Sequence, residues 1–188
     1  VPVLYGHRTT PGAEIYFVTN QSDQGISFAA EFRVKDLQPE LWDPVSGSCR
    51  KLPAFQPTTN GTTVPLELAP NQSAFVVFRD KAPTPQSGAV NYPAPQVVKN
   101  LNGPWTVAFQ KEQRGIETPL EMTTLSNLAD HEMDDVKHYS GTITYTTNFT
   151  LDAMPAGNLF VDLNDVAVMA KVKVNGQYAG GAWTPPYK

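Results

Sequence analysis

Residues 139–187 decide the fold, and they read YSGTITYTTNFTLDAMPAGNLFVDLNDVAVMAKVKVNGQYAGGAWTPPY. Apolar and polar residues alternate here in three short runs, the pattern of strands with one buried and one solvent-facing side. The alternating apolar positions are Ile143, Tyr145, Phe149 and Leu151, then Leu159, Val161 and Leu163, then Val168, Ala170, Val172 and Val174. Asn175 and Gly176 follow, and both tolerate the positive φ that a tight type I′ turn requires. Three strands and this turn predict an antiparallel β-sandwich.

Composition also favours an all-β protein. The 188 residues include 17 prolines and only 17% charged residues, which fits short strands joined by many loops. A net charge of -4 argues against nucleic acid or an anionic membrane surface as a partner. The sequence has no run of 18 apolar residues, so it predicts no membrane span. Cys49 is the single cysteine and has no partner for an internal disulfide.

The first 80 residues predict a small β-sandwich. Residues 1–10 are interpreted as an incoming connection, and six short runs with strand patterns follow it. These runs are residues 14–19, 28–34, 39–42, 49–52, 64–68 and 74–78. Turn signals separate them, including Asp43-Pro44 followed by Gly47, and Asn60-Gly61.

The chain is predicted to divide into two domains. Residues 80–95 read DKAPTPQSGAVNYPAP, and their prolines and lack of periodicity indicate a linker. The predicted parts are therefore a sandwich at 1–80, a Pro-rich linker at 81–96 and a second sandwich at 97–188. The second sandwich has five or six predicted strands, so it is expected to be incomplete. An unpaired sheet edge of this kind invites dimerisation by strand addition.

Three features of the second domain carry further expectations. Residues 115–121 are predicted as a loop or an edge strand, because Pro119 cannot donate a hydrogen bond within a sheet. Residues 125–137 are polar and acidic and could hold one helical turn, but they are predicted as a loop. Trp105 alternates with Val107, and together with Trp42 in the first domain it is predicted to lie in a core.

Several motifs resemble a known family. The segments IYFVTNQSD, PELWDPVSGSCRKLP and SAFVVFR resemble the β-sandwich that follows the catalytic barrel in glycoside hydrolase family 106, the α-L-rhamnosidases. The segments GPWTVAFQ, VKHYSGTITYTTNFTL and VDLNDVAVMAKVKVNGQYAGGAWTPPY are similar to the galactose-binding-like sandwich of those enzymes. They are also similar to the sugar-binding domain of family 2 glycosidases. The resemblance covers nearly the whole chain apart from the linker.

The resemblance implies an accessory role. Glycoside hydrolysis requires two carboxyl groups, about 5–5.5 Å apart for retention and about 6.5–9.5 Å apart for inversion. In these families a (β/α)₈ barrel carries that pair, and this chain has no alternation of strands with long helices. We therefore expect no catalytic residue here, an inactive fragment, and a catalytic barrel elsewhere in a larger enzyme that acts on plant or microbial polysaccharide. A bacterial parent acting in the periplasm or outside the cell is expected. A stand-alone carbohydrate-binding module or adhesin piece is the alternative.

Five residues are candidates for sugar contact. In family 2 enzymes the loop after the corresponding hairpin reaches the mouth of the active site, so the resemblance assigns such a role to Trp183 and to nearby Tyr187. An indole offers a flat apolar partner to the C–H face of a pyranose ring. His138 lies before a predicted strand, where it could contact a ligand or be structural. His7 and Arg8 lie where a barrel would precede the sandwich, so they either reach back to the sugar or pair at the domain interface.

Two polar clusters suggest weaker possibilities. Residues 131–135 read HEMDD, but a zinc protease motif needs a second histidine where Asp135 stands, so an acidic surface loop is the prediction. Asp162, Asn164 and Asp165 offer oxygens, and sandwiches of this class often hold a structural Ca²⁺, which takes six to eight oxygen ligands. Three candidates are too few to specify a metal site, so no cofactor is predicted.

Overall fold

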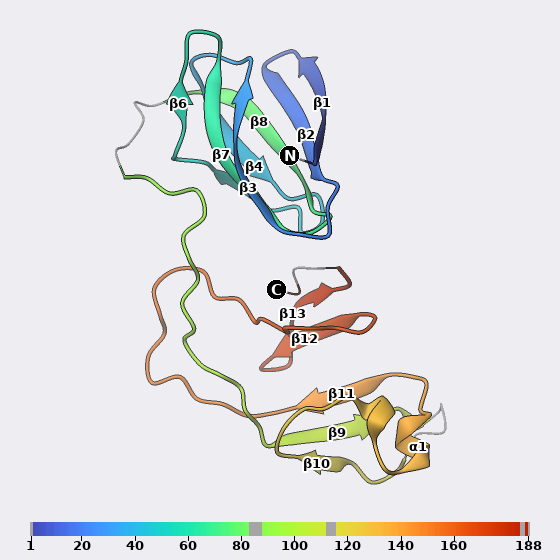
Figure 1. The fold of residues 1–188 in the computed structure, drawn as a ribbon. Coiled ribbons are helices and arrows are strands. Elements are labelled where there is room, and N and C mark those ends of the chain that lie inside the picture. The colour runs from blue at the N-terminus through green and yellow to red at the C-terminus, as the bar shows by residue number, and fades with distance from the viewer. Residues whose placement is uncertain (1, 83–87, 112–115, 185–186, 188) are drawn as a thin grey trace. The chain divides into compact units, whose positions relative to one another are not determined.

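The computed structural model describes residues 2–82, 88–111, 116–184 and 187, and it is nearly all β (Figure 1). The all-β prediction is confirmed, because several antiparallel sheets make up the described chain. The chain divides into two compact units, one of Val1–Ala94 with Phe160–Lys188 and one of Pro95–Leu159. The division at 81–96 stays a prediction, and residues 83–87 of that segment lie outside the described part.

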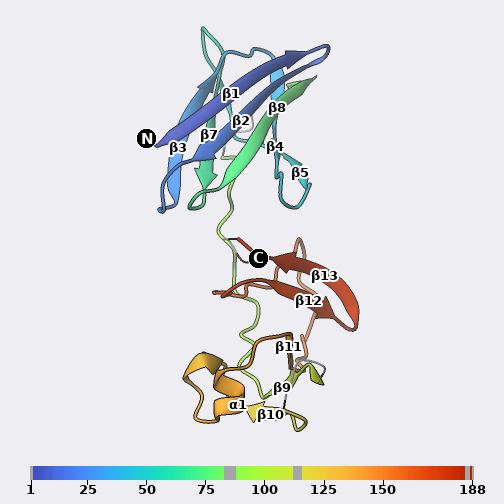
Figure 2. The ribbon, with the colours of Figure 1, turned by 90° about the vertical axis from the view of Figure 1, so that its right-hand side faces the viewer.

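Two sheets form a sandwich in the first 81 residues. One sheet has the strand order β1-β2-β8-β4-β5, and the other has the order β3-β7-β6. The strands are β1 (Val3–Thr10), β2 (Ala13–Asn20), β3 (Ile26–Phe32), β4 (Leu37–Trp42), β5 (Cys49–Lys51), β6 (Gln56–Pro57), β7 (Thr62–Leu68) and β8 (Ser73–Lys81). Figure 2 shows the five-stranded sheet in front, with β3 and β7 behind it.

Alternating apolar residues build the core between these sheets. On β7, every second residue from Thr62 to Leu68 is buried, as a strand with one buried face requires. The most deeply buried large side chains of this core include Leu52, Leu66 and Phe78, each 0–1% exposed. The six predicted strands of the first domain are therefore confirmed, with ends shifted by a few residues.

The interpretation of residues 1–10 as a connection is wrong. They form β1, which pairs with β2 along its whole length from Val3↔Asn20 to Thr10↔Ala13. Gly12, with φ of +93°, makes the tight turn between the two strands. No residue of the run VLYGHRTT is fully buried, so β1, at the edge of its sheet, lacks the clear apolar alternation of a half-buried strand.

The segment after β8 is anchored to the sandwich at Asn91. Its side-chain amide donates to the carbonyl oxygens of Ala54 and Pro65 at 2.8 and 3.0 Å, and its oxygen accepts the N–H of Ala54 at 2.8 Å. Asn91 is 3% exposed. Arg50 donates to the Asn91 carbonyl oxygen and lies over the ring of Tyr92. Asn91 and Tyr92 are thus a fixed part of the first unit.

The unit of Pro95–Leu159 has a small core of its own. Its sheet has the order β10-β9-β11, where β9 is Trp105–Phe109, β10 is Leu120–Met122 and β11 is Ile143–Thr146. A 3₁₀ turn η2 (Leu128–Asp130) and the one-turn helix α1 (Asp134–Lys137) lie in the stretch predicted as a loop. The buried residues are Val107, Phe109, Leu128 and Val136, and half-buried Trp105 packs against them, as predicted. Of the residues predicted as a loop or an edge strand, 116–119 form no strand and Leu120 begins the edge strand β10.

Of the three predicted runs of the opening stretch, the first is confirmed over Ile143–Thr146 and the third over Ala170–Val174, whereas the second is wrong. β12 (Ala170–Val174) pairs with β13 (Gln177–Ala182) through a turn in which Asn175 and Gly176 have φ of +51° and +78°. No strand forms among the described residues between β11 and β12, so Leu159, Val161 and Leu163 alternate without pairing. Apolar alternation alone did not distinguish this segment from a strand, because pairing depends on a neighbouring strand.

Candidate functional site

A polar cluster lies on the β1–β2 hairpin, and we call its four residues His7, Thr9, Glu14 and Tyr16 the His7 cluster. The antiparallel register sets His7 opposite Tyr16 and Thr9 opposite Glu14. Residues that face each other across an antiparallel pair point to the same side of the sheet. The cluster therefore shares the face of β2 that carries buried Tyr16 into the core.

The contacts in the His7 cluster are close. The Nε2 atom of His7 lies 2.6 Å from the Oε2 atom of Glu14, and the hydroxyl of Thr9 donates to the same oxygen at 2.8 Å. The ring of His7 stacks on the ring of Tyr16, with 4.0 Å between centroids and 7° between planes. The side chains of His7 and Glu14 are each 27% exposed. The carboxylate of Glu14 and the ring of Tyr16 thus hold the imidazole of His7 in one orientation.

Hydrogen bonding favours the ionised form of Glu14. The hydroxyl of Thr9 and then the ring of His7 hold the pKa of this carboxyl below its usual value of 4.5. Burial raises the pKa of the Tyr16 phenol, which therefore stays protonated at neutral pH. The cluster thus presents a carboxylate acceptor and an imidazole beside exposed Tyr5, a combination that can bind a hydroxylated ligand.

The His7 cluster does not have the arrangement that glycoside hydrolysis needs. That reaction uses a pair of carboxyl groups, one of them protonated to act as an acid. Glu14 is the one carboxyl group of the cluster, and its lowered pKa is opposite to what an acid catalyst requires. The cluster by itself therefore lacks the pair of carboxyl groups that glycoside hydrolysis needs.

Arg8 lies away from His7, although the two are adjacent in sequence. Neighbouring residues of a strand point to opposite faces of its sheet. Arg8 is opposite Ile15, whereas His7 is opposite Tyr16, so their side chains leave β1 on different sides. The two residues therefore do not serve one common ligand site.

Trp183 follows directly after β13 and is 55% exposed. Tyr187 accepts the N–H of Leu163 on its carbonyl oxygen at 2.9 Å, which links the end of the chain to the segment before β12. Pro185 and Pro186 of the same motif lie outside the described residues. The sugar contact that the resemblance implies for Trp183 and Tyr187 stays a prediction.

His138 belongs to the other unit and ends α1. Its backbone N–H and its ring nitrogen Nδ1 both lie within hydrogen-bond distance of the Asp134 carbonyl oxygen, at 3.0 and 3.1 Å. The last carbonyl groups of a helix have no N–H donor within the helix, and His138 supplies donors to one of them. The structure thus gives His138 a capping role in α1.

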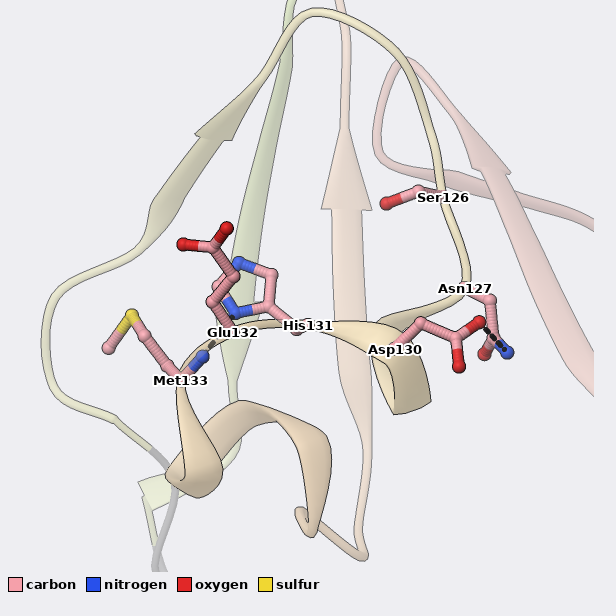
Figure 3. Close-up of a pocket in the computed structure, with 6 residues that line it drawn as sticks. All are labelled: Ser126, Asn127, Asp130, His131, Glu132 and Met133. Carbon is pink, nitrogen blue, oxygen red and sulfur yellow. Dashed lines mark hydrogen bonds between the residues drawn. The ribbon is translucent and has the colours of Figure 1, made fainter.

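A shallow hollow lies beside η2 and is lined by Ser126, Asn127, Asp130, His131, Glu132 and Met133 (Figure 3). Asp130 accepts a hydrogen bond from Asn127, and the Nδ1 atom of His131 accepts the Met133 N–H. Figure 3 shows the carboxylate of Asp130 turned toward Asn127, on the far side of the turn from the imidazole. Local turn contacts therefore account for these polar groups, in agreement with the surface-loop prediction.

The described residues contain no group of three or more His, Cys, Asp or Glu side chains that could hold a metal ion. Asp162 accepts the backbone N–H of Asn164 at 2.9 Å, and Asn164 adopts φ of +57°. This is a local turn of the kind that aspartate favours. The suggestion of calcium at residues 162–165 stays a prediction.

Thr9, Glu14 and Tyr16 are the site residues that sequence reasoning missed. Pro11 and Gly12 are a turn signal, and a hairpin centred on them places His7 opposite Tyr16 and Thr9 opposite Glu14. The signal was present, but the interpretation of residues 1–10 as a connection removed the partner strand.

Comparisons with known proteins agree with the resemblance. The family model described as alpha-L-rhamnosidase, glycoside hydrolase family 106, matches residues 1–56. A solved structure of a rhamnosidase from Novosphingobium sp. PP1Y superimposes on 98% of this chain with a TM-score of 0.82 and 34% sequence identity. A protein of Formosa agariphila named "Putative beta-glucuronidase" is 39% identical over 79 residues, or 42% of this chain.

The chain is short beside these relatives. It spans 17% of the Novosphingobium chain and 7% of the Formosa protein. The likeness to the rhamnosidases of family 106 is thereby confirmed for sequence and fold, and it concerns one region of much longer polypeptides.

Proposed function

We propose, from this confirmed likeness to the rhamnosidases of family 106, that the chain is a non-catalytic accessory region of a larger glycoside hydrolase. The observation that supports it most is the match of 98% of this chain to 17% of a rhamnosidase at a TM-score of 0.82. The His7 cluster, with a single carboxylate of lowered pKa, also favours a supporting role. The second sandwich is proposed to be galactose-binding-like, and both sandwiches to brace the catalytic barrel.

Trp183 is proposed to line the sugar site of the parent enzyme. Trp183 is 55% exposed directly after the end of β13, so much of its indole is open to solvent. A ring in such a position stacks on the C–H face of a pyranose and adds one N–H donor. Tyr187 is proposed as its companion at the same site.

The test is kinetic and uses the complete reading frame that contains this chain. We expect Trp183→Ala to lower kcat/KM for an aryl rhamnoside about tenfold, since an aromatic contact contributes about 0.5–1.5 kcal/mol beyond its area. Tyr178→Ala is the matched control, because Tyr178 is a 66% exposed aromatic residue on the same hairpin. Equal kcat/KM for the two variants and the unmodified enzyme would mean that the loop is structural. A reading frame without a glycosidase domain would refute the accessory role.

A stand-alone carbohydrate-binding module is the second candidate function. The observation that favours it is the placement of Tyr5, 67% exposed, on the same face as the His7 cluster. Under this alternative the 188-residue chain alone binds rhamnose-containing oligosaccharides in a calorimetric titration, and Tyr5→Ala abolishes the binding. The accessory role predicts negligible binding by the isolated chain.

Localisation and assembly follow from the proposal. An enzyme that acts on polysaccharide meets its substrate outside the cytoplasm, so we place the parent in the periplasm or outside a bacterial cell. Within the described residues, no helix has the length and apolar character to cross a membrane. A dimer through the open edge of the β12–β13 hairpin is a further proposal, and sedimentation at several protein concentrations tests it.

A further inference from the structure

The outward side of the five-stranded sheet carries a row of large apolar residues. The inward side contributes Tyr16, Val18, Val76 and Phe78 to the core, and strand alternation turns the residues between them outward. On this outer face Phe17 lies opposite Phe75, and Phe75 lies opposite Trp42, so the row crosses β2, β8 and β4 (Figure 2). Leu4 of β1 also belongs to this row, because its side chain points to the same outer face of the sheet.

This row is accessible to a partner. Leu4 is 61% exposed and Phe17 is 38% exposed, while Phe75 and Trp42 are half-buried. The rings of Phe17 and Phe75 lie 5.1 Å apart. The prediction that Trp42 belongs to the core is therefore wrong, because its parity places it on the outer face. Clustered apolar side chains on a surface mark sites of interaction.

A rigid polar group adjoins the row. Glu40 is 4% exposed and accepts the indole N–H of Trp42 at 2.9 Å. Arg79 contacts both Glu40 oxygens, at 3.1 and 3.3 Å, and its guanidinium lies over the Trp42 ring at 5.2 Å. Trp42 and Arg79 are thus held in place before any partner arrives. Preorganised Trp and Arg side chains are the residue types that dominate binding energy at protein interfaces.

The charges on the outer face identify the chemistry of the partner. Arg8 and Lys51 border the row on β1 and β5, and both are exposed. With Arg79 they make three cations against one carboxylate, Glu40, whereas the whole chain has a net charge of -4. Two copies meeting through this face would bring like charges together, which disfavours a homodimer. A partner with carboxylates around an apolar centre is favoured.

We infer that the outer face is covered, in the longer parent polypeptide, by an apolar protein surface bordered by Asp and Glu side chains. The inference rests on the proposed function, and it names the face through which the accessory sandwich braces its enzyme. Arg8, which the sequence suggested for sugar contact, then serves the protein interface. The His7 cluster, on the other side of β1, remains open.

Charge reversal tests the inference without disturbing the core. Arg8→Glu and Lys51→Glu change exposed side chains, and Lys35→Glu is a matched control because Lys35 is exposed between β3 and β4. In the 188-residue chain, we expect the Arg8 and Lys35 variants to have the same melting temperature, and the Lys51 variant a lower one, because its new carboxylate stands opposite Glu40. The effect of the interface is therefore the further change in melting temperature from the 188-residue chain to the full-length polypeptide. In the full-length polypeptide, we expect Arg8→Glu and Lys51→Glu to lower the melting temperature of this sandwich by about 2–4 °C more and the control to leave it unchanged.

A second pair of variants tests the apolar row. Phe17→Ser and Tyr5→Ser both remove an exposed aromatic ring from the β1–β2 hairpin, but from opposite faces. We expect Phe17→Ser to destabilise the full-length polypeptide more than the isolated chain. Tyr5→Ser should lower the free energy of unfolding by the same amount in both. For each variant, the loss of stability in the 188-residue chain is compared with the loss in the full-length polypeptide. A loss caused only by local contacts is the same in both and does not contribute to the difference.

The outcomes separate the two proposals. If Arg8→Glu and Phe17→Ser behave in the full-length polypeptide as their controls do, the outer face is uncovered and the inference is wrong, whatever the enzyme's activity. The inference also fails if the gene encodes no further polypeptide, or if the isolated chain dimerises and Phe17→Ser prevents it. If the expected shifts occur in a polypeptide without glycosidase activity, the interface stands and the proposed function fails.

Discussion

Glu14 makes a contribution to stability that depends on pH. Its folded pKa is below 4.5 because Thr9 and His7 bind the ionised carboxylate. A depressed carboxyl pKa stabilises the folded state above the unfolded pKa, and this contribution is lost as the pH falls through the folded pKa. We expect Glu14→Gln to lower the melting temperature at pH 7, and the difference from the unmodified chain to shrink below pH 4.5. Thermal melts across pH measure it, and a difference independent of pH would contradict the assignment.

Gly61 occupies a position that has no room for a side chain. A Cβ atom there would overlap the backbone carbonyl oxygen of Phe32, which cannot move without disturbing β3. We expect Gly61→Ala to cost about 3 kcal/mol in the free energy of unfolding. Gly6→Ala is the control, because nothing lies within 4 Å of its Cβ position and its φ is not left-handed. Urea titrations of the two variants test this, and equal midpoints would show that the turn can shift.

Strands that bury one or both faces had the clearest sequence patterns. β7 and β8 alternate or run apolar because one or both of their faces are buried. β1 was missed and residues 159–163 were wrongly assigned for the same reason, since pairing to a neighbour is not encoded in a single run of residues. The Asn175-Gly176 turn was located correctly because the requirement for positive φ is local.

Asn91 connects an irregular segment to two parts of the sandwich. Removing its side chain leaves the N–H and carbonyl of Ala54 and the carbonyl of Pro65 without their partners. Because Asn91 is 3% exposed, water cannot replace these bonds freely, and we expect Asn91→Ala to cost about 2–3 kcal/mol. Chemical denaturation measures the loss. Asn102→Ala, in the other unit and exposed, should cost nothing, and equal losses would indicate a different cause.

The two units contain cores of different size. Twelve buried residues form the core of the sandwich and four form that of the unit of Pro95–Leu159. We expect calorimetry to show two transitions, the smaller core melting first because it buries less apolar surface. Leu66→Ala should shift only the upper transition to lower temperature, and Phe109→Ala only the lower one. Each substitution should cost about 3 kcal/mol in the free energy of unfolding of its unit. A single transition moved by both variants would show that the units unfold together.

For the molecule as a whole, the sequence predicted some of the candidate site residues but not the contacts they make. The family resemblance singled out His7 and Trp183, and the structure leaves both side chains at least partly exposed. Their roles still depend on partners that the pattern does not reveal. Adjacent His7 and Arg8 diverge because a strand alternates its faces, and His138 caps a helix that was expected to be a loop.

Cys49 stands directly opposite Trp42 at the edge of the outer face, and it is exposed. The thiol of this chain's single cysteine can therefore carry a fluorescent or spin label at a chosen place without any substitution. A protein surface that covers this side of the sandwich would slow the alkylation of the Cys49 thiol, so the alkylation rate would report how closely that surface packs.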